Sequence, residues 1–121
     1  MDKTSYNESV YRRCISQYGE QNQVDMCLEE MSELTKALLK YRRKLSLIKG
    51  ECVNSTSDST DLKKAREDII DELADVKIMV RQMEMIFRAE EEVSARIDFK
   101  VSRQVKRLFD AAMESLKNEQ Q

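Results

Sequence analysis

The chain has 121 residues, of which 40% are hydrophobic and 36% are charged, and its net charge is −2. This is the size of one domain, with enough apolar residues for a single core. The nearly balanced charge excludes a basic protein that binds nucleic acid through its overall charge. No apolar run approaches the ~20 residues of a membrane span, and no signal-peptide pattern is present. We therefore expect neither nucleic acid nor a membrane as a partner.

The residue types that are missing or rare are also informative. There is no proline and no histidine, and the glycines are Gly19 and Gly50. Few helix breakers among many Glu, Lys, Leu and Met residues predict long helices. The lack of histidine excludes Ser–His and Cys–His nucleophile pairs and His-ligated metal sites. The three cysteines, Cys14, Cys27 and Cys52, are widely spaced and odd in number, so we expect no disulfide framework and a cytoplasmic location.

The N-terminal half is predicted to form a short helix and then a long one. Ser5 and Glu8 have the spacing of a capping box, with Ser5 as the N-cap. Gly19 is predicted to end this first helix in a left-handed conformation. An amphipathic pattern then predicts a helix over about 20–48.

A polar segment without periodicity separates this helix from the rest of the chain. Residues 50–61 are rich in Ser and Thr and are predicted to form a flexible loop. Helices are predicted over about 62–92 and about 95–117, with a break near Ser94. Residues 1–121 are therefore predicted to form one all-α domain, an antiparallel four-helix-type bundle.

A second apolar face on the helix of residues 62–92 predicts further packing. Ala74, Ile78 and Met85 lie about 200–240° around this helix from Glu72. A helix with two apolar faces is buried on both sides, by its own chain or by a second subunit. We therefore expect oligomerisation to complete the bundle.

Two pairs of acidic residues lie on helix faces that are otherwise apolar. Glu30 lies inside the apolar stripe of the first long helix, and Glu33 lies at its edge one turn later. Glu72 and Asp75 repeat this arrangement in the next long helix. A carboxylate buried alone must be neutralised, paired or bound to a cation. Acids that converge without histidine predict an all-oxygen site for Mg²⁺ or Mn²⁺, with Ca²⁺ less suited.

The alternative is that one helix rotates slightly, so that these acids reach solvent or pair with Lys or Arg. Basic residues also form a stripe on the last predicted helix, where Lys100 and Arg103 are candidates to bind phosphate groups. The alternative for this stripe is a solvated helix face. Gln21 and Gln23 are candidates to read a base edge, although solvent exposure also explains them. Tyr18, Tyr41 and Phe87 are candidates to stack on a base, although core packing also explains them.

The acidic motifs resemble those of a known family. Residues 28–34 (LEEMSEL) and 71–75 (DELAD) resemble the EExxE…ExxD signature of the MazG-like all-α nucleoside triphosphate pyrophosphohydrolases, which include dimeric dUTPases and dCTP pyrophosphatases. The resemblance covers about residues 18–107. Residues 98–103 (DFKVSR) are similar to the family's N-x-K-F-x-x-R stretch, with Asp98 in place of Asn and Val101 in place of Phe.

One further departure is the spacing of the two motifs. The 38 residues between Glu33 and Glu72 exceed the usual MazG spacing, and the excess falls in the expected Ser/Thr-rich loop. Such a connection lengthens at little cost in free energy. The metal-site prediction does not depend on it.

The resemblance implies a homodimer or homotetramer that cleaves a nucleoside triphosphate to the monophosphate and pyrophosphate. Matching positions assign Glu30, Glu33, Glu72 and Asp75 to Mg²⁺. We expect Glu30 or Glu33 to accept the proton of the attacking water, and Lys100 and Arg103 to bind the outer phosphates.

Two other functions are compatible with the same bundle. One is a non-catalytic helical assembly or regulatory protein, which would lack the metal dependence of thermal stability that a carboxylate site gives. The other is a hydrolase of the same fold that acts on another phosphorylated nucleotide, such as an alarmone. A substrate panel with analysis of the phosphate products separates this last function from the first.

Overall fold

The computed structural model describes residues 2–50 and 56–120, and the side chains of residues 49–50 and 56–59 are not described. This part of the chain contains helices and no strand, so the prediction of an all-α fold is confirmed. The helices are α1 (Lys3–Tyr18), α2 (Glu20–Gly50), α3 (Thr56–Phe87) and α4 (Glu90–Glu119). None of the described helices is both long and apolar enough to cross a lipid bilayer.

Helix α1 begins earlier than the capping-box pattern predicts. Its N-cap is Asp2, whose carboxylate oxygen accepts a hydrogen bond from the Ser5 backbone N–H at 2.7 Å. This hydrogen bond holds the pKa of Asp2 below its ordinary value. The prediction of Ser5 as the N-cap is therefore wrong, because a carboxylate one turn earlier satisfies the free N–H groups and adds a favourable charge at the helix N-terminus.

Gly19 separates α1 from α2, as predicted. Its φ is 93° and its ψ is 149°, a backbone conformation that is essentially restricted to glycine. Its N–H donates to the Ile15 carbonyl at 2.9 Å, and its carbonyl accepts from the Gln23 N–H at 3.1 Å. One residue therefore ends α1 and supplies a backbone acceptor to the first turn of α2.

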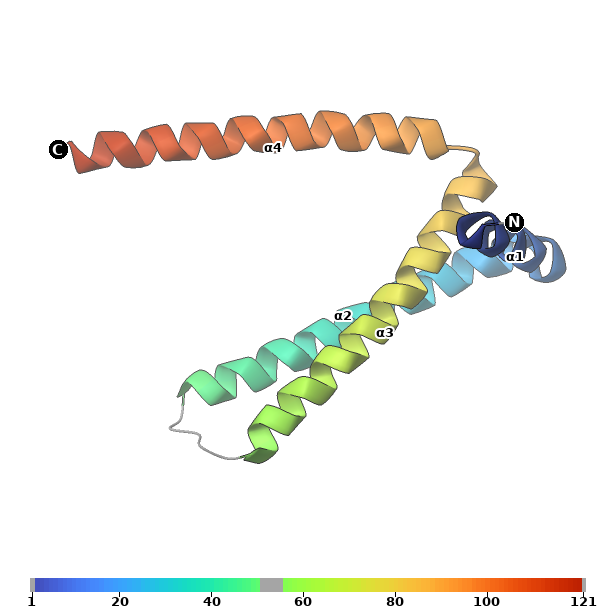
Figure 1. Cartoon of the computed structure of the whole chain (residues 1–121), viewed down its shortest axis with the longest axis horizontal. Helices are drawn as coiled ribbons and strands as arrows, with labels where there is room; N and C mark the ends of the chain where they lie inside the picture. Colours follow the sequence, from blue (N-terminus) through green and yellow to red (C-terminus); the bar gives the residue numbers. More distant parts are fainter. Residues whose placement is uncertain (1, 51–55, 121) are drawn as a thin grey trace. The chain divides into compact units, whose positions relative to one another are not determined.

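The next two helices pack side by side and antiparallel, and α1 packs against the end of the pair where α2 begins and α3 ends (Figure 1). The buried apolar residues among those described come from these two helices: Cys27, Ala37, Ala65 and Met79. Burial raises the pKa of the Cys27 thiol, so this cysteine is not an activated nucleophile. An ion pair between Arg81 Nη2 and Glu8 Oε1, 2.8 Å apart, connects α3 to α1.

The helix boundaries differ from the predictions at two places. Residues 56–61 belong to α3, so the predicted loop is wrong there, while residues 51–55 lie outside the described part. Polar residues without periodicity also suit the first turns of a helix, which explains this error. The predicted break near Ser94 is wrong as well: α3 ends at Phe87, where Arg88 has a φ of 52° and no glycine or proline marks the turn.

The chain divides into two compact units, residues 1–87 and residues 88–121. The first contains α1, α2 and α3. The second contains α4, which begins with Glu90, Glu91 and Glu92, three acids that complement the positive end of the helix dipole. The single domain over 1–121 stays a prediction.

We expect the Gly19→Ala variant to lower the free energy of unfolding by about 1–3 kcal/mol, the usual cost of a strained backbone conformation. A Cβ built at this position meets no atom within 4 Å, so the cost arises from the backbone conformation and not from a clash. Urea unfolding followed by circular dichroism measures it. The control is Gln21→Ala, at an exposed position two residues away. Equal stability of the glycine variant and the wild type would contradict this account.

Candidate metal centre

Three of the four predicted metal ligands converge where α2 packs against α3. Carboxylate oxygens of Glu30, Glu72 and Asp75 all lie within 4.8 Å of one another. Glu72 and Asp75 are three residues apart on α3 and therefore share one helix face, while Glu30 reaches them from α2. Glu30 and Glu72 are half-buried and Asp75 is exposed.

The electrostatics of this cluster disfavour three negative charges. The pKa of Glu30 lies above its ordinary value, because burial removes water from its carboxylate, and because the charges of Asp75, Glu72 and Glu29 repel a further charge. A hydrogen bond with the Asp75 side chain also raises the pKa of Glu30. Such groups take up protons or bind a cation when a cation is available.

Glu72 is the second unfavourable feature of this cluster. Its Oε2 atom is buried and has no hydrogen-bond partner in the structure. A buried carboxylate oxygen without a partner carries a desolvation cost that nothing offsets. Oxygens around a single Mg²⁺ lie about 3–4 Å apart, given the ~2.1 Å bond length and octahedral geometry. The donor set of three carboxylates, with oxygens within 4.8 Å of one another, therefore suits a hard divalent cation.

Glu33 is not part of this cluster. Its carboxylate lies 3.2 Å from Lys36 Nζ, one turn along α2, and its side chain is 45% exposed. It lines a small cavity of about 210 Å³ together with Asp68, Asp71 and Glu72. For Glu33 the structure therefore shows pairing with lysine, the alternative considered for these acids, and its role as a metal ligand stays a prediction.

The predicted phosphate ligands lie in the second unit. Lys100 and Arg103 are both exposed on α4, one turn apart. The guanidinium carbon of Arg103 lies 6.0 Å from the centre of the Phe99 ring, at the outer limit of a cation–π contact. Their binding to phosphate stays a prediction.

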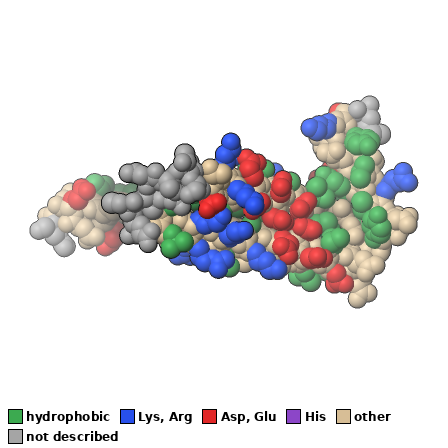
Figure 2. Space-filling view, turned by 90° about the horizontal axis from the view of Figure 1, so that it is seen from below, with side chains coloured by type: hydrophobic (Ala, Val, Ile, Leu, Met, Phe, Trp, Pro, Cys, Tyr) green, Lys and Arg blue, Asp and Glu red, His purple; other side chains and the backbone are tan. Residues whose placement is uncertain are grey.

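Beside the acidic cluster is a cavity of about 420 Å³ between α1, α2 and α3. The residues that line it are Cys14, Tyr18, Asn22, Gln23, Met26, Glu30, Asp75, Ile78, Met79 and Gln82. Two of the acids are therefore part of its wall. Figure 2 shows Asp and Glu side chains gathered between a group of Lys and Arg side chains and an area of hydrophobic side chains.

The sequence pattern singled out Gln23 but not Gln82, its partner in a buried polar pair in the wall of this cavity. Gln23 Nε2 donates a hydrogen bond to Gln82 Oε1 at 2.6 Å, and the two side chains are 6% and 2% exposed. Gln82 lies on the same stripe of α3 as Glu72 and Met79, and Gln23 lies one turn before Cys27 on α2. A glutamine inside an apolar stripe is the signal that would have found Gln82.

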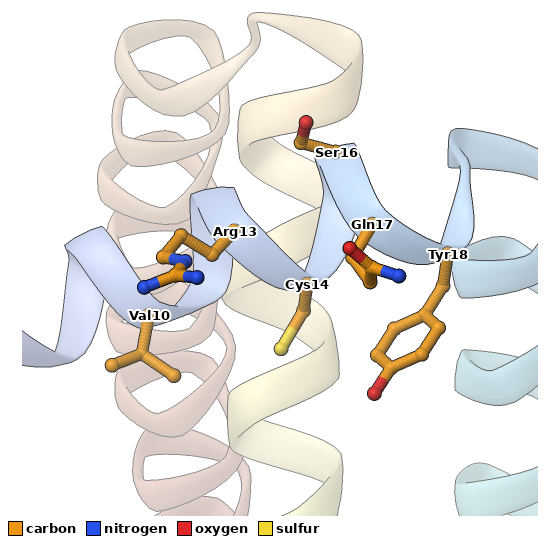
Figure 3. A pocket seen from close by; sticks show the side chains of 6 residues that line it. All are labelled: Val10, Arg13, Cys14, Ser16, Gln17 and Tyr18. Carbon is orange, nitrogen blue, oxygen red and sulfur yellow. The ribbon is translucent and has the colours of Figure 1, made fainter.

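Another cavity, of about 550 Å³, lies along α1 (Figure 3). The lining residues are Val10, Arg13, Cys14, Ser16, Gln17 and Tyr18, and no carboxylate is among them. Figure 3 shows Cys14 and Tyr18 projecting from the same side of α1. Both residues also line the cavity beside the acids, so this face of α1 forms part of its wall.

No family model, curated protein or solved structure matches the chain. The resemblance to the MazG-like family therefore depends on the residues of the acidic and basic motifs alone. The metal centre depends on the geometry described above.

The raised pKa of Glu30 predicts how the stability of the metal-free protein changes with pH. An acid whose pKa is higher in the folded state costs stability when it ionises there, and this cost disappears as the pH falls towards its ordinary pKa. In EDTA, the Glu30→Gln variant should therefore be more stable than the wild type at neutral pH. This advantage should shrink as the pH falls.

Urea unfolding of both proteins across the acidic range measures this difference. The control is Glu20→Gln, an exposed glutamate at the start of the same helix. A difference between wild type and Glu30→Gln that does not change with pH would contradict the assignment.

Proposed function

We propose that this protein is a Mg²⁺-dependent nucleoside triphosphate pyrophosphohydrolase that also accepts Mn²⁺. It converts a ribo- or deoxyribonucleoside triphosphate and water to the monophosphate and pyrophosphate. The observation that carries the proposal is the convergence of Glu30, Glu72 and Asp75 oxygens within 4.8 Å beside a cavity of about 420 Å³. The resemblance to the MazG-like family supplies the reaction class.

The acids of the cluster have distinct proposed roles. Glu30, Glu72 and Asp75 hold the cation. When bound, Mg²⁺ neutralises charge on the phosphates and orients the attacking water. Glu30 or Glu33 accepts the proton of that water, and Glu33 suits this role because it lies one turn from Glu30 and outside the cluster of three.

Cations of the chain are also needed for the outer phosphates. We propose that Lys100 and Arg103 bind them, because both match the basic motif of the family and both are exposed on α4. Arginine suits this role because its planar guanidinium forms paired hydrogen bonds with phosphate oxygens.

A homodimer or homotetramer is the proposed assembly, and the exposed apolar residues support it. Helix α4, taken by itself, buries no residue, and its apolar stripe is exposed at Val93, Ile97, Val101, Val105 and Leu108. In the first unit, Leu28, Met31, Leu73 and Val80 are between 44% and 63% exposed. Each lies about 100° or more around its helix from Glu30 or Asp75, so a subunit could cover them without blocking the acids. Exposed apolar patches of this kind mark association surfaces.

The Glu30→Gln variant tests the proposed reaction. We expect pyrophosphate release to fall by more than about 100-fold, because a bound cation supplies several kcal/mol of charge stabilisation in the transition state. The measurement is Mg²⁺-dependent pyrophosphate release over a panel of ribo- and deoxyribonucleoside triphosphates, with an alarmone included.

The matched control is Glu67→Gln, an exposed acid on α3 that is not in the cluster. Both variants should keep the helical circular dichroism spectrum of the wild type. Wild-type activity in Glu30→Gln, or a wild-type protein that hydrolyses no nucleotide, would refute the proposal.

A further inference from the structure

We infer that the cavity between α1, α2 and α3 binds the nucleobase of the substrate, that Gln23 reads the hydrogen-bonding edge of the base, and that Gln82 fixes the orientation of the Gln23 amide. The reading of a substrate base rests on the proposed function. The cavity itself is lined by residues of the first unit alone.

The distribution of charge in the cavity indicates the shape of its ligand. Charged residues are confined to the Glu30 and Asp75 part of the wall, and the remaining side chains of the lining are uncharged. A ligand that fits both parts has an anionic group, which a cation at the acids would hold, and a neutral body. The volume of about 420 Å³ is in the range of small-molecule sites. A nucleotide combines an anionic phosphate chain with a neutral planar base.

The neutral part of the wall combines apolar contacts with a few polar groups. Met26, Ile78 and Met79 supply apolar surface, and methionine adapts its shape to a flat ring. Tyr18 supplies an aromatic face at the end of α1, where it is 60% exposed and lines the cavity. Protein sites that take up single bases use this combination of stacking and hydrogen bonding.

The amide pair supplies the selective contact. A glutamine side chain has one acceptor oxygen and two N–H donors, more than the single Gln23–Gln82 hydrogen bond uses. Bases differ in the order of donors and acceptors along their edges, and glutamine can read that order through two hydrogen bonds at once. The 2.6 Å bond to Gln82, at a position 2% exposed, determines which way the Gln23 amide points. Gln82 is therefore a positioning residue.

Binding of nucleosides, which lack phosphates, tests the cavity without reference to catalysis. The protein is labelled with ¹³C at its methionine methyl groups and titrated with each common deoxynucleoside at millimolar concentration. We expect the Met26 and Met79 methyl signals to shift and the Met31 signal to stay, because Met31 lies on α2 but does not line the cavity. Equal shifts at Met31, or no shift with any nucleoside, would overturn the inference.

Tyr18→Ala is the variant least able to disturb the core, and Tyr6→Ala is its control. Both tyrosines lie on α1 and are 60% exposed, but Tyr6 does not line the cavity. We expect nucleoside affinity to fall about tenfold or more in Tyr18→Ala, the usual effect of losing one stacked ring. The Tyr6→Ala variant should bind as the wild type does. Equal affinity of the two variants would count against the cavity as the base site.

The amide assignment is tested by base selectivity, which a structural role alone would not change. We expect Gln23→Met and Gln82→Met to reduce the ratio of kcat/KM between the preferred nucleotide and its competitors by about 10- to 100-fold. The methionine methyl spectrum shows whether each variant is folded. Wild-type selectivity in both variants would overturn the assignment, and so would a wild-type protein without base selectivity. The pyrophosphohydrolase proposal would stand in either case. Methyl shifts at Met26 and Met79 in a protein that hydrolyses no nucleotide would support the cavity and refute the proposed function.

Discussion

The repulsion between the carboxylates of α2 and α3 is the constraint on which the rest of the site depends. The two helices pack antiparallel and bring Glu30, Glu72 and Asp75 oxygens to within 4.8 Å of one another. The pKa of Glu30 is raised and one oxygen of Glu72 has no partner, so the cluster is unfavourable when fully ionised. A divalent cation converts this repulsion into attraction, because each carboxylate then faces a positive charge.

The same helix interface continues from the acids to the buried amides. Gln23 lies seven residues before Glu30 on α2, and Gln82 lies seven residues after Asp75 on α3, so both amides are two helical turns from the acids. Helix α1 covers this part through Cys14 and Tyr18. One interface therefore carries a charged region and a neutral region with specific polar groups, as a ligand with the same two parts requires.

The sequence was sufficient to predict the features that depend on periodicity. Counting at 3.6 residues per turn placed Glu30 and Glu72 inside apolar stripes, and a glycine between two amphipathic patterns placed the end of α1 at Tyr18. Two helix boundaries lacked a reliable local signal. The turn at Arg88 has no glycine or proline to mark it, and Asp2 caps α1 where a Ser–Glu pattern favoured Ser5.

Contacts between helices were beyond the reach of a single sequence. The hydrogen bond between Gln23 and Gln82 joins residues 59 positions apart, and each glutamine alone is compatible with solvent exposure. Glu33 similarly shares a motif with Glu30, but its carboxylate lies beside Lys36. A helical-wheel projection of one helix gives the face on which a side chain lies. The residue that this side chain contacts depends on the register of the neighbouring helix.

Anomalous diffraction from crystals grown with Mn²⁺ is the most direct test of the central claim. The account predicts an anomalous peak for a Mn²⁺ ion that is coordinated by carboxylate oxygens of Glu30, Glu72 and Asp75. Crystals of the folded protein at saturating Mn²⁺ with no peak among these three side chains, or with the three side chains spread apart in solvent, would contradict it.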